Sequence, residues 1–264
     1  MVDRRRRLTT GHGEDGDRAV SDVVAFVFTF SIIITSVGVV SGVGFSVMED
    51  VRDDEQALNA QRSFQTLGEN LNQIDRGGVP GRAGEISLSG GLVLVESGSE
   101  GPTFEVETDG DTFTSETETG RIVYQSSGDD TEILLEAGGV IRKDERSDQG
   151  FVVQRPNIVC STSGSKYAIV SIVEIVGNAD TVAGDSTVQI RGREQSSTLL
   201  YSDDSASSVT VNYDDSQFDE SWNGHFDREG DWIVDTSANT AECVVGSDGH
   251  VIVRRTVIEI TVVN

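Results

Sequence analysis

Lysine is nearly absent from this chain of 264 residues, which has only Lys143 and Lys166, whereas acidic residues are abundant. There are 45 acidic and 20 basic residues, and the formal net charge is −25. Such acidity argues against a nucleic-acid partner, because binding to phosphates relies on basic side chains. A solvated carboxylate surface with little lysine is typical of proteins that work in concentrated salt, where screening weakens the repulsion between like charges.

Histidine is scarce, and so are the patterns that accompany catalysis. His12, His225 and His250 have no second histidine at metal-ligand spacing, and neither cysteine belongs to a CxxC pair. No glycine-rich phosphate loop or nucleophile elbow is present. Glycoside hydrolysis requires a pair of carboxylates, and Asp219 and Glu220 could mimic such a pair. In so acidic a chain we interpret them instead as solvated residues of a helix face. We therefore predict no enzymatic activity, no metal and no cofactor.

Only two cysteines occur, Cys160 and Cys243, and both lie in short apolar stretches that predict strands. Two alternatives are open for them. They form a disulfide, which persists outside the cell and would contribute about 4 kcal/mol by closing a long loop, or they remain two isolated buried thiols.

Charge is also absent from one continuous run of 26 residues, Val23 to Met48. A helix needs about 20 apolar residues to cross the hydrocarbon of a membrane, so this run is long enough to span it. A signal peptide has a shorter apolar core and a small-residue cleavage site after it, whereas acidic residues follow here. Arg4 to Arg7 and Arg18 precede the run and predict a cytoplasmic N-terminus, with all later residues outside. We thus expect a single-pass cell-membrane protein in contact with lipid.

Small residues recur within the run, including the pair Gly38-x-x-x-Gly42. Such spacing lets helix backbones approach closely in apolar surroundings. Glycine and serine are also simply common in membrane helices. The pair therefore either marks a face on which another helix packs or reflects only the usual composition of membrane helices.

The boundary before the run reads Arg18-Ala19-Val20-Ser21-Asp22-Val23-Val24-Ala25. It resembles the class III signal sequence of archaeal type IV pilins, and most closely a divergent haloarchaeal pilin-like group. Asp22 stands where haloarchaeal pilins often have proline, and Ala25 where they have glycine. The resemblance implies that a prepilin peptidase removes residues 1–19 by cutting between Ala19 and Val20. It also implies that the helix then assembles with itself or with other pilins into a surface filament, as a major or a minor subunit.

Asp22 supports two interpretations. Asp and Ser are favoured at helix N-caps, so the residue caps the helix. By resemblance to bacterial pilins, its carboxylate instead meets the α-amine of a neighbouring subunit during assembly, because a carboxylate beside a membrane helix requires a partner.

The helical pattern continues beyond the apolar run. Apolar residues fall mainly at steps of three, four and seven through Ile74, and Gly77-Gly78-Val79-Pro80 ends the pattern. We expect a membrane and stalk helix over residues 20–76. From residue 85 to 264 the pattern is that of a β-rich extracellular head, a sandwich or a partly open barrel.

Two local signals within the head are specific. Asp109-Gly110 between alternating stretches predicts a hairpin, and Phe218, Trp222 and Phe226 at four-residue steps predict a short helix packed on a sheet. The expected strands cover residues 85–88, 92–95, 104–107, 112–114, 121–126, 131–136, 151–154, 166–176, 186–191, 197–202, 207–213, 231–234, 249–253 and 255–263. The fold class is therefore α+β: a long helix followed by an all-β head with one short helix.

Two functions fit these features. The first is a non-enzymatic type IV pilin-like subunit for surface filaments or adhesion. The alternative is a permanently anchored extracellular protein that binds a ligand or partner and does not polymerise.

Overall fold

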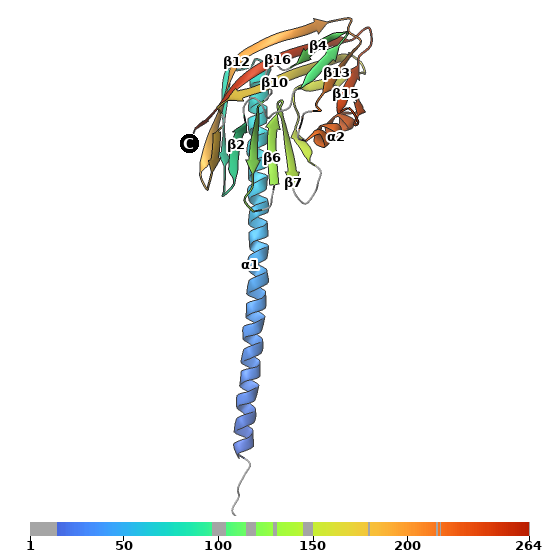
Figure 1. The fold of residues 1–264 in the computed structure, drawn as a ribbon. Coiled ribbons are helices and arrows are strands. Elements are labelled where there is room, and N and C mark those ends of the chain that lie inside the picture. The colour runs from blue at the N-terminus through green and yellow to red at the C-terminus, as the bar shows by residue number, and fades with distance from the viewer. Residues whose placement is uncertain are drawn as a thin grey trace, which may run out of the picture. The chain divides into compact units, whose positions relative to one another are not determined.

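A computed structural model describes residues 15–96, 104–114, 120–128, 131–144, 150–178, 180–214, 216 and 218–263. The chain divides into two compact units, Met1–Val51 and Arg52–Asn264. One long helix, α1 (Asp15–Asp75), contributes residues to both units (Figure 1). The prediction of a long N-terminal helix followed by a mostly β head with one short helix is confirmed.

Helix α1 continues without interruption because its sequence has no proline and tolerates Gly68. It begins at Asp15, within the predicted leader, and ends one residue before the predicted end. The termination follows from Gly77, whose φ of 72° suits glycine and turns the chain out of the helix. The amides of Gly77 and Gly78 donate to the carbonyls of Ile74 and Gln73, which satisfies carbonyls that the helix end would leave unpaired.

The C-terminal part of α1 is a core element of the head. Side chains three or four residues apart lie on one helix face, and here they are fully buried. They are Ala57, Ala60, Phe64, Leu67, Leu71 and Ile74. This stripe packs with the apolar faces of two sheets, so residues 52–75 belong to the head unit rather than to a separate stalk.

The first sheet pairs strands from both ends of the head, in the order β1-β12-β16-β10-β9. Its long central strands run side by side in Figure 1, with β10 and β16 parallel and the other pairs antiparallel. The strands are β1 (Gly81–Ser87), β9 (Ile158–Ser161), β10 (Tyr167–Gly177), β12 (Thr187–Asp203) and β16 (His250–Val263).

The second sheet is antiparallel throughout, in the order β11-β2-β5-β6-β7-β8. A tight turn joins β6 to β7, and both of its residues, Ala137 and Gly138, have positive φ, as a two-residue hairpin with matched twist requires. The strands are β2 (Leu92–Glu96), β5 (Arg121–Gln125), β6 (Thr131–Glu136), β7 (Gly139–Asp144), β8 (Phe151–Gln154) and β11 (Asp180–Ala183).

The third sheet has the order β14-β15-β13-β3-β4 and packs with the short helix α2 (Asp219–Glu229). The predicted hairpin at Asp109-Gly110 is confirmed, because both residues have positive φ and join β3 to β4. The strands are β3 (Glu105–Thr108), β4 (Asp111–Thr114), β13 (Ser208–Asn212), β14 (Ile233–Asp235) and β15 (Thr240–Val244).

Two apolar cores hold these layers together. One joins α1 to the first two sheets and includes Phe64, Ile86 and Tyr124. The other joins all three sheets to α2 and includes Trp222 and Val253. The residues that α1 and α2 contribute to these cores are apolar and lie at helical spacing.

Several strand predictions were wrong in detail. The expected strands at 186–191 and 197–202 form one strand, β12, which pairs along β16 with register shifts at Glu194/Ser196 and Leu199/Tyr201. Such bulges absorb an extra residue without ending the strand. The strands at 249–253 and 255–263 are likewise one strand, β16. Strand β7 was missed because Arg142 interrupts its apolar pattern, whereas the fold pairs this arginine with Asp144 at 2.8 Å.

Candidate functional site

The N-terminal unit presents an apolar helix surface that no described residue of the chain covers. Residues 21–48 of α1 are exposed throughout, including Phe26 and Met48, each 70 % exposed. Among the described residues, this is the one helix long and apolar enough to cross a membrane. Exposed apolar area costs roughly 25 cal/mol per Å² in water, so the surface favours lipid or other helices as its surroundings.

Four hydroxyl side chains of this segment are satisfied within the helix itself. Thr29, Ser31 and Ser36 donate to carbonyls four residues earlier, at 2.9, 2.7 and 2.7 Å. Ser46 donates to the carbonyl three residues earlier, at 3.0 Å. A polar group without a partner is costly in hydrocarbon. These bonds therefore lower the cost of placing the four hydroxyl groups in a lipid environment.

One face of the segment is hollowed and apolar. Small hydroxyl residues between larger side chains create the hollow, which is lined by Phe28, Ser31, Ile32, Thr35, Ser36, Val39 and Val40. Gly38 and Gly42 do not line it, and a Cβ added at either glycine meets nothing within 4 Å. The described residues thus place no neighbour against the predicted glycine face.

The boundary residues lie inside the same helix. Arg18, Ala19 and Val20 have helical backbone, and their side chains are outside the described part of the chain. Asp22 is exposed and lies seven residues after the start of α1 in the uncut chain. A cut before Val20 would instead make it the third residue, in the first helical turn, where a carboxylate interacts favourably with the helix dipole.

The head holds the C-terminal end of α1 through a buried polar cluster. Asp75, 1 % exposed, accepts hydrogen bonds from Ser171 Oγ at 2.6 Å and Asn157 Nδ2 at 2.5 Å. Arg254 Nε lies 3.7 Å from the same carboxylate. A carboxylate at a helix C-terminus is unfavourable for the dipole, so these three partners compensate for its position and fix the helix end on the first sheet.

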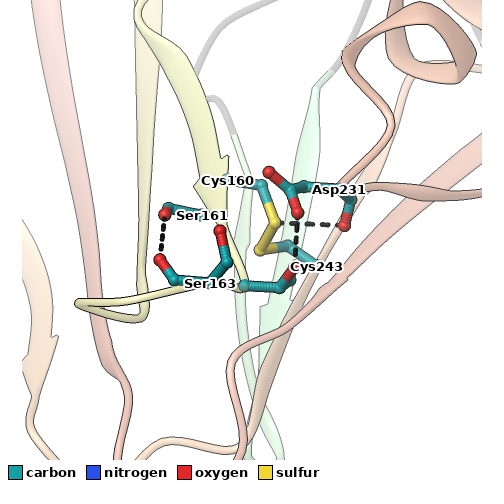
Figure 2. The surroundings of a disulfide bond; sticks show 6 residues. Cys160, Ser161, Ser163, Asp231 and Cys243 are labelled. Carbon is teal, nitrogen blue, oxygen red and sulfur yellow. Dashed lines mark hydrogen bonds between the residues drawn. A yellow bond between two sulfur atoms is a disulfide. The ribbon is translucent and has the colours of Figure 1, made fainter.

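Cys160 and Cys243 form a disulfide in this structure, with their Cα atoms 5.9 Å apart (Figure 2). It joins the edge strand β9 of the first sheet to β15 of the third, and both cysteines lie in strands as predicted. Cys160 Sγ lies 3.2 Å from the carbonyl oxygen of Asp231. This is a close contact and not a hydrogen bond, because a disulfide sulfur carries no hydrogen. Thr162 donates a hydrogen bond to the Asp231 carboxylate. The disulfide therefore links two sheets beside α2.

A polar groove of about 810 Å³ follows the exposed side of α2. Its walls come from three segments: α2, the start of β8 and the turn between β14 and β15. The lining residues are Gly150, Phe151, Asp219, Glu220, Asn223, Gly224, Asp227, Arg228, Thr236 and Asn239. Asp219 and Glu220 thus lie on one groove as adjacent residues, whereas the neighbouring Trp222 is fully buried in the core.

Hydrogen bonds orient the amides of this groove. The hydroxyl of Tyr213 donates to Asn223 Oδ1 at 2.7 Å, and Asn223 Nδ2 donates to Asn239 Oδ1 at 3.0 Å. Asn239 Nδ2 in turn donates to Asp219 Oδ2 at 3.0 Å and to Asp214 Oδ1 at 2.9 Å. Asn239 has a φ of 48°, a backbone conformation that asparagine tolerates better than most residues. The groove is therefore lined by pre-oriented polar groups.

The opposite side of α2 includes the buried His225 and packs on the buried Glu136. Glu136 Oε1 accepts hydrogen bonds from Trp222 Nε1 at 2.7 Å and Ser216 Oγ at 2.6 Å, and complete burial raises the pKa of this carboxyl. Burial, together with the charges of Arg155 and Arg228, lowers the pKa of His225 to about 4. These groups attach α2 to the core, and they do not line the groove.

Within the described residues, no group of three or more His, Cys, Asp or Glu side chains is arranged to hold a metal ion. The groove itself was not predicted from the sequence. The one signal that pointed toward it is Gly224, a glycine in the middle of an otherwise helical pattern.

Comparison with known proteins gives one family and one distant relative. The model of a family of unknown function (DUF7289) matches residues 18–262. An uncharacterized protein of Archaeoglobus fulgidus is 23 % identical over 199 residues, which cover 59 % of this chain and 64 % of the relative. The chain thus spans less than two thirds of the length of that relative. No solved structure matches.

Proposed function

We propose that this chain, which belongs to the DUF7289 family of unknown function, is a membrane-anchored surface protein and a type IV pilin-like subunit. The observation that carries the proposal is the uncharged run Val23–Met48, which forms a continuous helix and is covered by no described part of the chain. A helix of this kind has to be covered either by lipid or by the helices of other subunits.

Charge and covalent structure support an N-in orientation with the head outside. Arginines lie before the span and acidic residues after it, as expected for a cytoplasmic N-terminus. The disulfide between Cys160 and Cys243 belongs to the part that this orientation places outside, where disulfides persist. The acidity of the chain suits a head in concentrated salt. We interpret the layered sheets of this head as a sandwich-like domain.

Processing and assembly are the second part of the proposal. A prepilin peptidase cuts between Ala19 and Val20 and removes the leader. The helix of the mature chain then packs with the helices of other copies or of other pilins. The family model matches residues 18–262, a range that includes Arg18 to Val20, the apolar run and the head. The apolar hollow between Phe28 and Val40 provides a surface into which a neighbouring helix side chain fits.

Mass-spectrometric mapping of the N-terminus tests the processing step. The full chain is expressed in archaeal cells that contain a prepilin peptidase, together with the variants Ala19→Leu and Ala25→Leu. We expect a mature end at Val20 in the wild type and in Ala25→Leu, the matched control, and an uncut chain in Ala19→Leu. An intact leader on the wild-type protein in membranes would overturn processing and leave the permanently anchored binding protein.

Assembly needs a separate measurement, because a cut subunit can remain in the membrane. Sheared surface material is collected from cells that express the wild type or Ala19→Leu, and filaments are labelled with antibody against the head. Labelled filaments from the wild type alone support a pilin-like subunit. Head antigen confined to the membrane in both strains contradicts assembly while leaving the anchor intact.

A further inference from the structure

The polar groove of the head has a feature that packing does not explain. Gly224 lies in the interior of α2, where glycine costs about 1 kcal/mol relative to alanine. A Cβ added at Gly224 meets nothing within 4 Å, so no neighbouring atom requires the glycine. By contrast, a Cβ at the other groove glycine, Gly150, would lie 2.6 Å from Ser221 Oγ. Gly224 lines the groove, so its missing side chain leaves that space open.

Several groups around this opening accept hydrogen bonds. Asn239 Nδ2 already donates both of its hydrogens, to Asp214 and Asp219. Arg228 Nε donates a hydrogen bond of 2.8 Å to the carbonyl of Gly224. The carboxylates of Glu220 and Asp227 are further acceptors on the groove wall, beside Asp219, whose two oxygens already accept from the amide of Glu220 and from Asn239. A ligand that complements such a wall is rich in hydrogen-bond donors.

An aromatic ring lies at the rim of the same groove. Phe151 is 39 % exposed, although phenylalanine is usually buried, and it lines the groove at the start of β8. Ligand sites commonly combine an aromatic surface with a few fixed polar groups. Three carboxylates against one arginine repel anions, so phosphorylated, sulfated and other acidic ligands are disfavoured.

We propose that this groove binds a neutral saccharide. The ring of Phe151 packs against the apolar C–H face of a sugar, while Asp219, Asn223 and neighbouring carboxylates bind its hydroxyl groups. The absent side chain at Gly224 gives the sugar access to the helix backbone. The inference does not depend on whether the chain is cut before Val20 or assembled into filaments.

The test uses the full chain in lipid nanodiscs, because many detergents carry sugar head groups that would compete. The probes are the neutral trisaccharides of glucose, mannose and N-acetylglucosamine, with tri-galacturonate as the anionic comparison and spermidine as a cationic one. Binding is measured by saturation-transfer NMR and titration calorimetry in about 1 M salt, which screens non-specific charge effects. We expect at least one neutral trisaccharide to bind with a Kd of about 1 mM or tighter.

Two variants at one position provide the decisive comparison. Gly224→Gln fills the groove with a good helix-forming residue, and Gly224→Ala makes the same backbone change with only a methyl group. Both should be at least as stable as the wild type, which thermal unfolding checks. We expect the glutamine variant to weaken saccharide binding about tenfold or more, and the alanine variant to bind within about twofold of the wild type.

Phe151→Ala and Phe151→Tyr test the aromatic contact in the same way, with loss expected for alanine alone. The proposal is overturned if none of the neutral trisaccharides binds, or if Gly224→Gln binds them as well as Gly224→Ala. Binding of tri-galacturonate or spermidine alone would assign the groove to a charged ligand and equally contradict it.

Discussion

The carboxylate of Asp75, the last residue of α1, accepts a hydrogen bond of 2.6 Å from the hydroxyl of Ser171 in β10, and both residues are buried. The bond joins positions 96 residues apart in the chain. It shows that the end of the long helix is fixed by specific polar contacts as well as by its apolar stripe. The adjacent Arg76 extends this attachment through two hydrogen bonds to Asn157 Oδ1, at 2.9 and 2.7 Å.

Asp75→Ala should destabilise the head strongly. The variant leaves the hydroxyl of Ser171, the amide of Asn157 and the charge of Arg254 without their common partner, and breaking a buried pair of this kind costs about 3–5 kcal/mol. Urea unfolding followed by tryptophan fluorescence measures the loss. Asp54→Ala, an exposed position on the same helix, serves as the control and should change stability by less than about 0.5 kcal/mol. Equal effects of the two substitutions would contradict the proposed attachment.

Removal of the disulfide should lower the free energy of unfolding by about 4 kcal/mol, since the bond closes a loop of 83 residues. The double variant Cys160→Ala/Cys243→Ala measures this in the absence of thiols. Wild-type protein unfolded in reducing agent should approach the same stability. If reduction leaves the unfolding midpoint unchanged, the disulfide does not stabilise the head.

The stability of the head should fall as the pH is lowered from about 6.5 to 4 because of His225. Its pKa is lowered to about 4 by burial, so in this window the unfolded chain binds a proton that the folded chain does not. The loss amounts to at most about 3 kcal/mol. His225→Phe, which keeps a ring among the aromatic neighbours, should remove this component. The difference between wild-type and variant unfolding curves across the window isolates it from other groups, and a flat difference would contradict the assignment.

The contribution of Glu136 to stability should change with pH in the opposite direction to that of His225, and Glu136→Gln tests this. Because burial raises the pKa of Glu136, its contribution to stability is present at low pH and is lost as the pH rises and the buried carboxyl ionises. Both observed hydrogen bonds end on Oε1, so a glutamine can keep them. The stability of the variant relative to the wild type should therefore increase as the pH rises above about 4.5, the ordinary pKa of the carboxyl, as measured by chemical unfolding at each pH.

Truncations should separate the two units at a defined place. Residues 52–264 contain the whole buried stripe of α1, so this fragment should be soluble without detergent and should unfold cooperatively. A fragment that begins at residue 78 lacks Phe64, Leu67, Leu71 and Ile74 and should fail to fold, since replacing even one buried leucine by alanine costs about 2–5 kcal/mol. Circular dichroism and gel filtration distinguish these outcomes. A folded, monomeric 78–264 fragment would show that α1 is dispensable for the head.

The long helix, its end near Gly77, the Asp109-Gly110 hairpin and the helix around Trp222 could all be predicted, because each depends on neighbours within a few residues. Helical periodicity, glycine turns and an aromatic stripe are local properties of the chain. Strand lengths were predicted less well. The bulges in β12 depend on its pairing with β16. The burial of Arg142 in β7 depends in part on a hydrogen bond of 2.9 Å to Gln61 Oε1, which lies 81 residues away, so no local pattern reports either feature.

By itself the sequence determined the apolar run, the acidic surface and the arginine-rich boundary at Arg18-Ala19-Val20, since charge and hydropathy are properties of composition and order alone. Only the tertiary structure decided that residues 52–75 are a core element of the head, that Cys160 meets Cys243, and that Gly224 opens onto a groove. The physical reason is that burial, disulfide geometry and cavities arise from which surfaces meet. These encounters join residues more than 80 positions apart, and packing of the whole head selects them.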